Sequence, residues 1–155
     1  MTEFGRLLAD LNDAGIRYVV IGGIAVIRHG VVRATADLDI VIARSDIDRL
    51  GELIGRWQAT RPDGSPLMAD DVEPDRSIHL RTPLGFLDVL ASPGGAVGFE
   101  GLEARAETRR VDGTPAPICS LADLVALKRL AGRGRDLVDL DELQTAHGEL
   151  PDSRD

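Results

Sequence analysis

The feature that most constrains this chain is a pair of aspartates inside a stretch that is otherwise apolar. Residues 36–43 read Ala-Asp-Leu-Asp-Ile-Val-Ile-Ala, a pattern that predicts a β-strand. Since side chains alternate between the two faces of a strand, Asp37 and Asp39 share one face, and the apolar residues between and after them share the other. Burying ionised carboxylates is costly, so the fold has to neutralise this pair.

A divalent cation is the partner that these acids favour. Strand rise separates Asp37 from Asp39 by about 6.6 Å along the backbone, so their side chains can converge on one or two hard cations. A third acid, Asp88, lies in the predicted strand 85–90, which can lie beside the first strand. Three such acids can hold two Mg²⁺ ions about 3.5 to 4 Å apart, as in phosphoryl and nucleotidyl transfer. We therefore predict that Asp37, Asp39 and Asp88 are metal ligands and catalytic residues.

A glycine pair precedes the aspartate strand. Residues 17–21 predict a strand that ends at Gly22 and Gly23, and residues 24–29 predict a short helix that ends at Gly30. Glycines let the backbone approach a phosphate closely, and a helix start offers free N–H groups, so we expect a triphosphate here. The pair lacks the lysine of a P-loop and the third glycine of the dinucleotide motif. By itself it also fits a simple tight turn.

The remaining patterns predict an α+β fold. Further helices are expected over 3–14, 45–57 and 120–130 and from residue 135 or 136 onward, and β-patterned pairs are expected at 77–81 with 85–90 and at 108–111 with 116–119. A length of 155 residues is typical of one domain, so we expect a single domain over 1–150 and a frayed tail over 151–155.

Local signals predict how some of these helices begin and which face they bury. Ser45 with Asp48, and Ser120 with Asp123, have the spacing of a capping box. On the last helix we expect three leucines to face the core, namely Leu137, Leu140 and Leu143.

Charge and composition narrow the functional classes. A net charge of -8 argues against coating nucleic acid by bulk attraction, because that mode of binding needs a basic face. The single cysteine, Cys119, excludes an internal disulfide and is expected to be a small buried residue. No run approaches the roughly 20 apolar residues that cross a bilayer, and the start lacks a signal-peptide pattern, so we expect a soluble cytoplasmic protein without a membrane partner.

One segment has a recognisable order of motifs. Residues 22–40, G-G-I-A-V-I-R-H-G-V-V-R-A-T-A-D-L-D-I, resemble the core motif of the DNA polymerase beta nucleotidyltransferase superfamily. The closer resemblance is to its AbiEii-type branch, which is linked to toxin-antitoxin and abortive-infection systems. It covers 18–42 well, includes Asp88 as the third carboxylate, and extends loosely over 121–143, where the matching residues are Lys128, Arg135, Asp136, Asp139 and Leu140.

The resemblance implies both a fold and a reaction. The fold is a small mixed β-sheet flanked by helices, with further helices at the C-terminus. The reaction is transfer of a nucleoside monophosphate from a nucleoside triphosphate (NTP) to an acceptor hydroxyl with Mg²⁺. Gly22 and Gly23 would hold phosphate, Asp37 and Asp39 the metals, and Asp88 would help to activate the acceptor oxygen. The chain departs from the family at Gly23, where many members have serine, and it is shorter than the toxin enzymes of that branch.

Three more residues are predicted to bind the nucleotide: Arg33, Thr35 and Lys128. Each also has a structural interpretation. Arg33 and Thr35 can pair with neighbouring groups, and Thr35 can orient the aspartates. Lys128, the only lysine, can instead be a solvated helix residue. Arg135 and Asp136 fit an ion pair at a helix start, and His29 fits a structural role at a helix end.

Several functions remain open on the sequence. An active enzyme could have tRNA, a protein or a small molecule such as an aminoglycoside as its acceptor, although the negative charge and scarce aromatic residues do not support tRNA. The alternative is a weakly active or inactive protein of the same fold that binds a cognate toxin or antitoxin. An unrelated α+β binding domain would require the ordered motif to be accidental.

Overall fold

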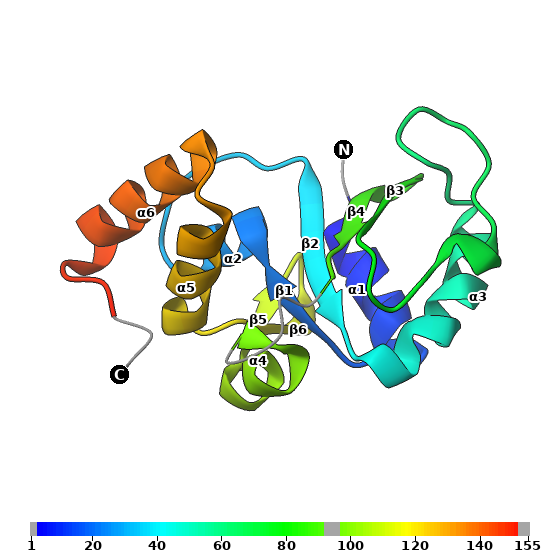
Figure 1. The fold of residues 1–155 in the computed structure, drawn as a ribbon, viewed down its shortest axis with the longest axis horizontal. Coiled ribbons are helices and arrows are strands. Elements are labelled where there is room, and N and C mark those ends of the chain that lie inside the picture. The colour runs from blue at the N-terminus through cyan, green and yellow to red at the C-terminus, as the bar shows by residue number, and fades with distance from the viewer. Residues whose placement is uncertain (1–2, 92–96, 152–155) are drawn as a thin grey trace.

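A mixed six-stranded sheet forms the centre of the protein. The computed structural model describes residues 3–91 and 97–151. The strand order is β3-β4-β2-β1-β6-β5 (Figure 1). β1 pairs antiparallel with β2 and parallel with β6, β2 pairs parallel with β4, and two antiparallel hairpins form the edges. The strands are β1 (Tyr18–Ile21), β2 (Asp37–Ile42), β3 (Ile78–Thr82), β4 (Gly85–Val89), β5 (Glu107–Val111) and β6 (Thr114–Ile118). The predicted α+β class with a mixed sheet is confirmed.

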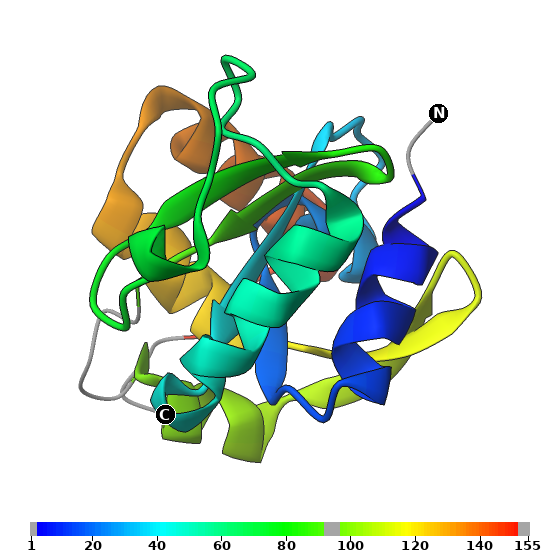
Figure 2. The same cartoon turned by 90° about the vertical axis from the view of Figure 1, so that its right-hand side faces the viewer.

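Helices cover both faces of this sheet. Figures 1 and 2 together show α1 and α3 on one side, and α5 and α6 on the other. The helices are α1 (Phe4–Asp13), α2 (Gly22–Arg28), α3 (Ile47–Trp57), α4 (Phe99–Arg105), α5 (Leu121–Ala131) and α6 (Gly134–His147), with 3₁₀ turns η1 (Arg44–Asp46) and η2 (Ala69–Asp71). No helix of the described residues is both long and apolar enough to cross a membrane.

The core follows the strand order. All four residues of β1 are buried, because this strand lies inside the sheet and has helices on both sides. The stripe predicted for α1 packs beneath the sheet, and its leucines at positions 7, 8 and 11 are fully buried. Strands β2 and β4 thus present their polar side chains from a sheet whose centre is buried.

The predicted helix caps are only partly correct. Ser45 lies in the 3₁₀ turn η1 and does not cap α3, whose N-cap residue is Asp46. The carboxylate of Asp46 accepts a hydrogen bond from the backbone N–H of Arg17 at 3.0 Å, which joins α3 to the strand side of the fold. Ser120 does cap α5, and its Oγ accepts from the N–H of Asp123 at 3.1 Å. The Asp123 carboxylate instead pairs with an arginine of α4.

The last helix has a different inner face from the one predicted. Leu143 is buried as expected, but Leu137 is 59% exposed and Leu140 is half-buried. One turn before Leu143 the buried residue is Asp139, and two turns before it the buried residue is Asp136. Helical periodicity of leucines misled the prediction because the neighbouring elements offer cations, not apolar groups, at this end of α6.

Two segments differ from, or lie beyond, the predicted elements. Helix α4 was not predicted, because seven residues are too few for a clear helical period. It is held by two buried apolar side chains, Phe99 and Leu102. Most of the predicted frayed tail, residues 152–155, lies outside the described residues.

Candidate functional site

The register between β2 and β4 brings two of the three predicted carboxylates together. In this parallel pair Asp39 lies opposite Asp88, and Asp37 lies opposite Phe86. Asp37, Asp39 and Asp88 are all half-buried, whereas the alternating residues Leu38 and Leu87 are fully buried on the other face. The predicted shared face and the predicted neighbouring strand are both correct.

Asp39 lies in surroundings that disfavour the charged form of its carboxyl group. Burial raises its pKa, the charges of Asp88 and Asp37 raise it further against a small opposing effect of Arg135, and the resulting pKa is about 7. Its Oδ1 atom is buried and has no hydrogen-bond partner in the described part of the chain. A buried carboxylate oxygen normally has a hydrogen-bond donor or a cation as its partner, so this oxygen is a candidate ligand for one.

The carboxylates suit a hard cation in chemistry but are not yet arranged around one. Mg²⁺ prefers carboxylate oxygens, and the unpartnered Asp39 oxygen is the kind of ligand it uses. However, no three acidic, histidine or cysteine side chains within 3–91 and 97–151 are grouped closely enough to hold a metal as they stand. The two-Mg²⁺ site with Asp37, Asp39 and Asp88 therefore stays a prediction.

The two glycines lie inside α2, not in a turn before it. The helix begins at Gly22, two residues earlier than predicted. Gly22 has a φ of +67°, and a Cβ atom there would lie 2.8 Å from Cγ of Asp39. A Cβ atom on Gly23 would lie 2.8 Å from Oγ1 of Thr35. Each glycine is thus required by a specific residue of the β2 region, and the pair brings α2 into contact with the acids.

Thr35 holds the start of the aspartate strand. Its hydroxyl donates to the carbonyl of Asp37 at 3.2 Å and lies 3.5 Å from the Asp37 N–H. These contacts agree with the interpretation that Thr35 orients the aspartates. Binding of the nucleotide by Thr35 stays a prediction, as it does for Gly22 and Gly23.

Lys128 is buried in an ion-pair cluster that joins α5 to α6. Its Nζ lies 3.0 Å from Oδ1 of Asp136 and 2.9 Å from Oδ2 of Asp139. Arg33 reaches the same cluster, and its Nη1 lies 2.6 Å from both oxygens of Asp139. The interpretation of Lys128 as a solvated residue is wrong, because only 6% of it is exposed.

The expected ion pair at the start of α6 involves a different arginine. Arg133, not Arg135, pairs with Asp136, with its Nε 2.8 Å from Oδ2. Burial alone would raise the pKa of Asp136, but hydrogen bonds from Arg133 and Lys128 outweigh it and lower the pKa to about 2. Arg135 forms no ion pair within the described residues, and it acts on Asp39 through its charge. It remains available to a ligand on the carboxylate side.

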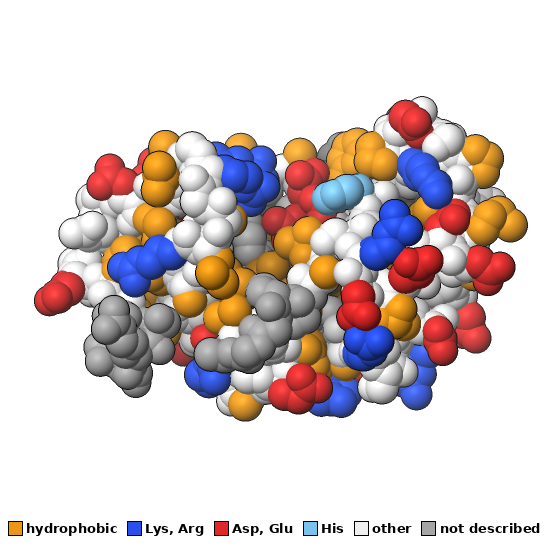
Figure 3. Space-filling model, viewed as in Figure 1, with side chains coloured by type: hydrophobic (Ala, Val, Ile, Leu, Met, Phe, Trp, Pro, Cys, Tyr) orange, Lys and Arg blue, Asp and Glu red, His pale blue; other side chains and the backbone are white. Residues whose placement is uncertain are grey.

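A hollow lies between the glycine pair and α5. Its volume is 310 Å³, and its polar lining includes Gly22, Asp39, Lys128 and Arg133. The apolar lining comes from the sheet and from the leucines of α5, namely Val41, Leu90, Leu124, Leu127 and Leu130. Figure 3 shows acidic side chains in the middle of this face and basic side chains over the junction of α5 and α6.

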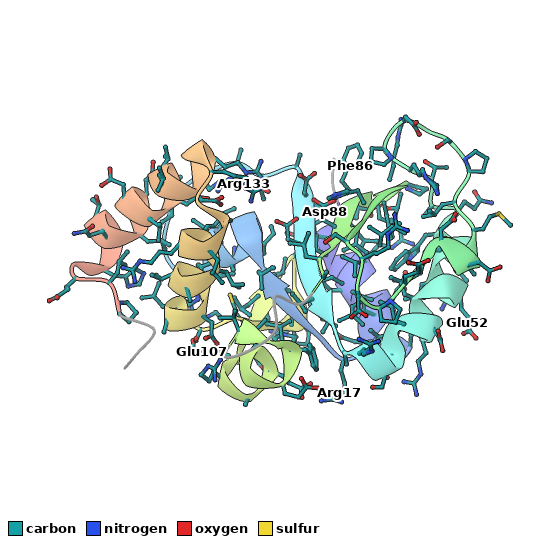
Figure 4. The ribbon with its side chains drawn as sticks, in the orientation of Figure 1. Arg17, Glu52, Phe86, Asp88, Glu107 and Arg133 are labelled. Carbon is teal, nitrogen blue, oxygen red and sulfur yellow. The ribbon has the colours of Figure 1, made fainter. Side chains whose placement is uncertain are left out.

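The structure adds two residues that sequence analysis missed. The ring Nδ1 of His79 lies 2.7 Å from Oδ1 of Asp88, across the β3–β4 hairpin. Phe86, two residues before Asp88 on the same face, is 38% exposed (Figure 4). The tight turn at residues 83–84 sets the register of the hairpin and was the signal that could have revealed both positions.

Two other singled-out residues are structural. His29 is buried, and its Nε2 donates to the carbonyl of Cys119 at 2.8 Å, while the ring of His147 bonds to the His29 carbonyl. Burial raises the pKa of the Cys119 thiol to about 12, which makes it unreactive at neutral pH.

Comparison with known proteins identifies the fold. No known protein family and no curated protein matches the sequence. The structure does match an antigenic nucleotidyltransferase-like protein from Paracoccidioides brasiliensis, with a TM-score of 0.62, 20% identity, and coverage of 92% of this chain and 72% of that one. The chain has the nucleotidyltransferase fold.

Other proteins with the nucleotidyltransferase fold match over nearly their whole length. A putative nucleotidyltransferase from Thermotoga maritima has a TM-score of 0.60 and 14% identity, over 94% of this chain and 96% of that one. ANT(2")-Ia, in complex with adenylyl-2"-tobramycin, has a TM-score of 0.63 and 13% identity, over 94% and 87%. The structural similarity establishes the nucleotidyltransferase fold. Because the sequence identities are this low, the reaction has to be inferred from the site.

Proposed function

We propose that this protein is a Mg²⁺-dependent nucleotidyltransferase that moves a nucleoside monophosphate from an NTP to an acceptor hydroxyl. The observation that carries the proposal is Asp39, which lies opposite Asp88 on the same face as Asp37 and has a buried oxygen with no hydrogen-bond partner among the described residues. Clustering acids destabilises a fold unless cations or enough hydrogen-bond donors offset their charge, and a site for a cation and a triphosphate gives this cluster a use.

The 310 Å³ hollow is the proposed nucleotide site. Gly22 and Asp39 border it on the sheet side, and Arg133 borders it from the α5–α6 junction. The leucines of α5 offer an apolar wall for the nucleobase, and Arg133 offers charge-assisted hydrogen bonds to phosphate. Lys128 and Arg33 act here by holding α6 against the site through Asp139.

The proposed chemistry assigns a role to each of the three acids. Asp37 and Asp39, with Asp88, would hold Mg²⁺, which supplies neutralisation of the charge that develops on the phosphates. Asp88 accepts the proton of the acceptor hydroxyl, and the acceptor oxygen bonds to the α-phosphorus. The bond from this phosphorus to the bridging oxygen breaks, and pyrophosphate leaves with the electron pair.

Two observations bear on the acceptor and its setting. ANT(2")-Ia was solved with an adenylylated tobramycin, and LnuA, a lincosamide antibiotic adenylyltransferase, matches with a TM-score of 0.61 and 14% identity over 93% of this chain. A small hydroxyl compound is therefore one candidate acceptor. Separately, the motif order of residues 22–40 supports a toxin-antitoxin or abortive-infection setting for the reaction.

The test is transfer of label from each of four α-labelled NTPs, with Mg²⁺ and cell extract. We expect wild-type protein to label an acceptor, and the Asp37→Asn/Asp39→Asn double variant to label none. Asp48→Asn is the matched control, because this aspartate is exposed on α3, away from the site. Absence of both labelling and NTP binding in the wild type would exclude the enzymatic function.

A second candidate function is binding of a partner protein without catalysis. Exposed apolar side chains on the C-terminal helices favour it, since Leu130, Leu137 and Val138 are each more than half exposed. Such a partner would be a cognate toxin or antitoxin. This function predicts a complex that forms equally well without NTP and with the double aspartate variant.

A further inference from the structure

His79 and Asp88 form a direct pair across the β3–β4 hairpin. The antiparallel register places the two residues opposite each other, and their side chains meet at 2.7 Å between Nδ1 and Oδ1. The next pair on the same face, Arg81 opposite Phe86, has no such bond among the described contacts. Asp88 is in turn opposite Asp39 on β2, so the three residues form one row across the sheet.

The bond constrains both partners. An ionised carboxylate only accepts hydrogen bonds, so Nδ1 of His79 carries the hydrogen and donates it. Donation to Oδ1 holds the Asp88 carboxylate in one orientation and leaves its other oxygen free of this bond. The histidine is thus related to Asp88 as an orienting residue is to a catalytic acid or base.

We propose that His79 is a positioning residue, which holds the Asp88 carboxylate in the orientation that accepts the proton of the acceptor hydroxyl. This inference rests on the proposed function. His79 itself transfers no proton in the step; its Nδ1–H stays bonded to Asp88 while the acceptor oxygen attacks phosphorus. The alternative, a stabilising role for the pair, is disfavoured, because 56% of the His79 side chain is exposed and exposed ion pairs contribute little stability.

His79 also lies apart from the nucleotide site. It borders a separate hollow of 510 Å³, which is otherwise lined by residues from the 61–78 segment. The lining of the 310 Å³ hollow does not include His79. Loss of the imidazole should therefore slow transfer to the acceptor and leave NTP binding unchanged. A residue that merely stabilised the hairpin would affect both.

The first experiment compares label transfer by wild type, His79→Ala, His79→Asn and Arg81→Ala at saturating NTP. We expect His79→Ala to lower the transfer rate by about 10- to 100-fold with an unchanged KM for NTP. His79→Asn should recover most of the rate, because its amide N–H can donate to Asp88. Arg81→Ala, the matched control on the same strand and face, should retain the rate. Equal rates for wild type and His79→Ala, or equal losses in His79→Ala and Arg81→Ala, would overturn the proposal.

The second experiment observes the pair without activity, by long-range ¹H–¹⁵N NMR of the histidine rings. We expect His79 to carry hydrogen on Nδ1 in wild type, and this signature to be lost in Asp88→Ala. A neutral ring with hydrogen only on Nε2 in wild type would also overturn the proposal. An active wild type with an unaffected His79→Ala refutes this inference alone, whereas a wild type that neither binds NTP nor transfers label refutes the proposed function as well.

Discussion

A side chain on Gly22 would collide with Asp39, because its Cβ atom would lie 2.8 Å from Cγ of the aspartate. The backbone at Gly22 also has a φ of +67°, which side chains with a Cβ rarely adopt. The glycine therefore allows the first turn of α2 to lie directly against the acid with the unpartnered oxygen.

Replacing this glycine should damage both stability and nucleotide binding. We expect Gly22→Ala to lower the free energy of unfolding by about 2 kcal/mol or more and to weaken NTP binding, since α2 must move away from β2. Gly55→Ala is the matched control, because Gly55 lies in α3 with nothing within 4 Å of its Cβ position. The control should be neutral or stabilising by about 0.5 to 1 kcal/mol. Urea unfolding measures both, and equal effects of the two substitutions would contradict this account of Gly22.

Asp39 should make the free protein less stable as pH rises. Its pKa is about 7 when folded, above the ordinary value of 3.8, so the folded state holds its proton more tightly than the unfolded chain does. The stability associated with this proton is present below pH 4 and is lost as the pH rises to 7. Asp39→Asn should therefore raise the free energy of unfolding at pH 8 by up to about 4 kcal/mol while abolishing transfer.

The measurement for Asp39 is thermal unfolding of both proteins at pH 5 and pH 8, without metal. The difference in Tm should be larger at pH 8. A variant that is less stable than wild type at pH 8 would show that Asp39 has a stabilising partner in the free protein.

Lys128 should be essential to the packing of α6. Lys128→Met leaves Asp136 and Asp139 buried without their shared cation, and we expect a loss of about 3 to 5 kcal/mol in the free energy of unfolding. The control is Arg44→Met, which breaks an ion pair with Asp75 whose side chains are both more than 70% exposed. That change should stay within about 0.5 kcal/mol. Denaturant unfolding tests both, and a neutral Lys128→Met would mean that α6 does not depend on this cluster.

Arg135 should contribute to nucleotide affinity. Its charge acts on Asp39, yet no ion pair within the described residues involves its guanidinium, so it can meet a phosphate. We expect Arg135→Ala to weaken NTP binding by about tenfold, or 1.4 kcal/mol. Arg129→Ala, an exposed arginine on α5, should not change the affinity measured by calorimetry. Equal weakening by both variants would indicate a general effect of net charge.

The fold class and the aspartate pair were accessible from the sequence because they depend on local rules. Alternation along a strand places Asp37 and Asp39 on one face wherever the strand lies. Hydrophobic runs likewise predicted all six strands within about two residues, and helix periodicity predicted α1, α3 and α5. Helix α4 was missed, since seven residues carry too little periodicity.

The partners of charged residues were not accessible in the same way. The sequence suggested Arg135 as the partner of Asp136 at a helix start, whereas the structure uses Arg133 and Lys128. It also suggested a leucine face for α6, whereas Asp139 faces inward because it pairs there with Lys128 and Arg33. His79 belongs to no motif of its own, because its role depends on which residue the hairpin places opposite it, and only the turn at residues 83–84 indicates that register.

The sequence by itself determined the α+β class and the shared face of Asp37 and Asp39, since these follow from backbone periodicity. Only the tertiary structure decided that Asp88 lies opposite Asp39, that one Asp39 oxygen has no partner in the described part of the chain, and which cations are already engaged. Strand register and ion pairing join residues far apart in the chain, so their energies depend on distances that no local pattern contains.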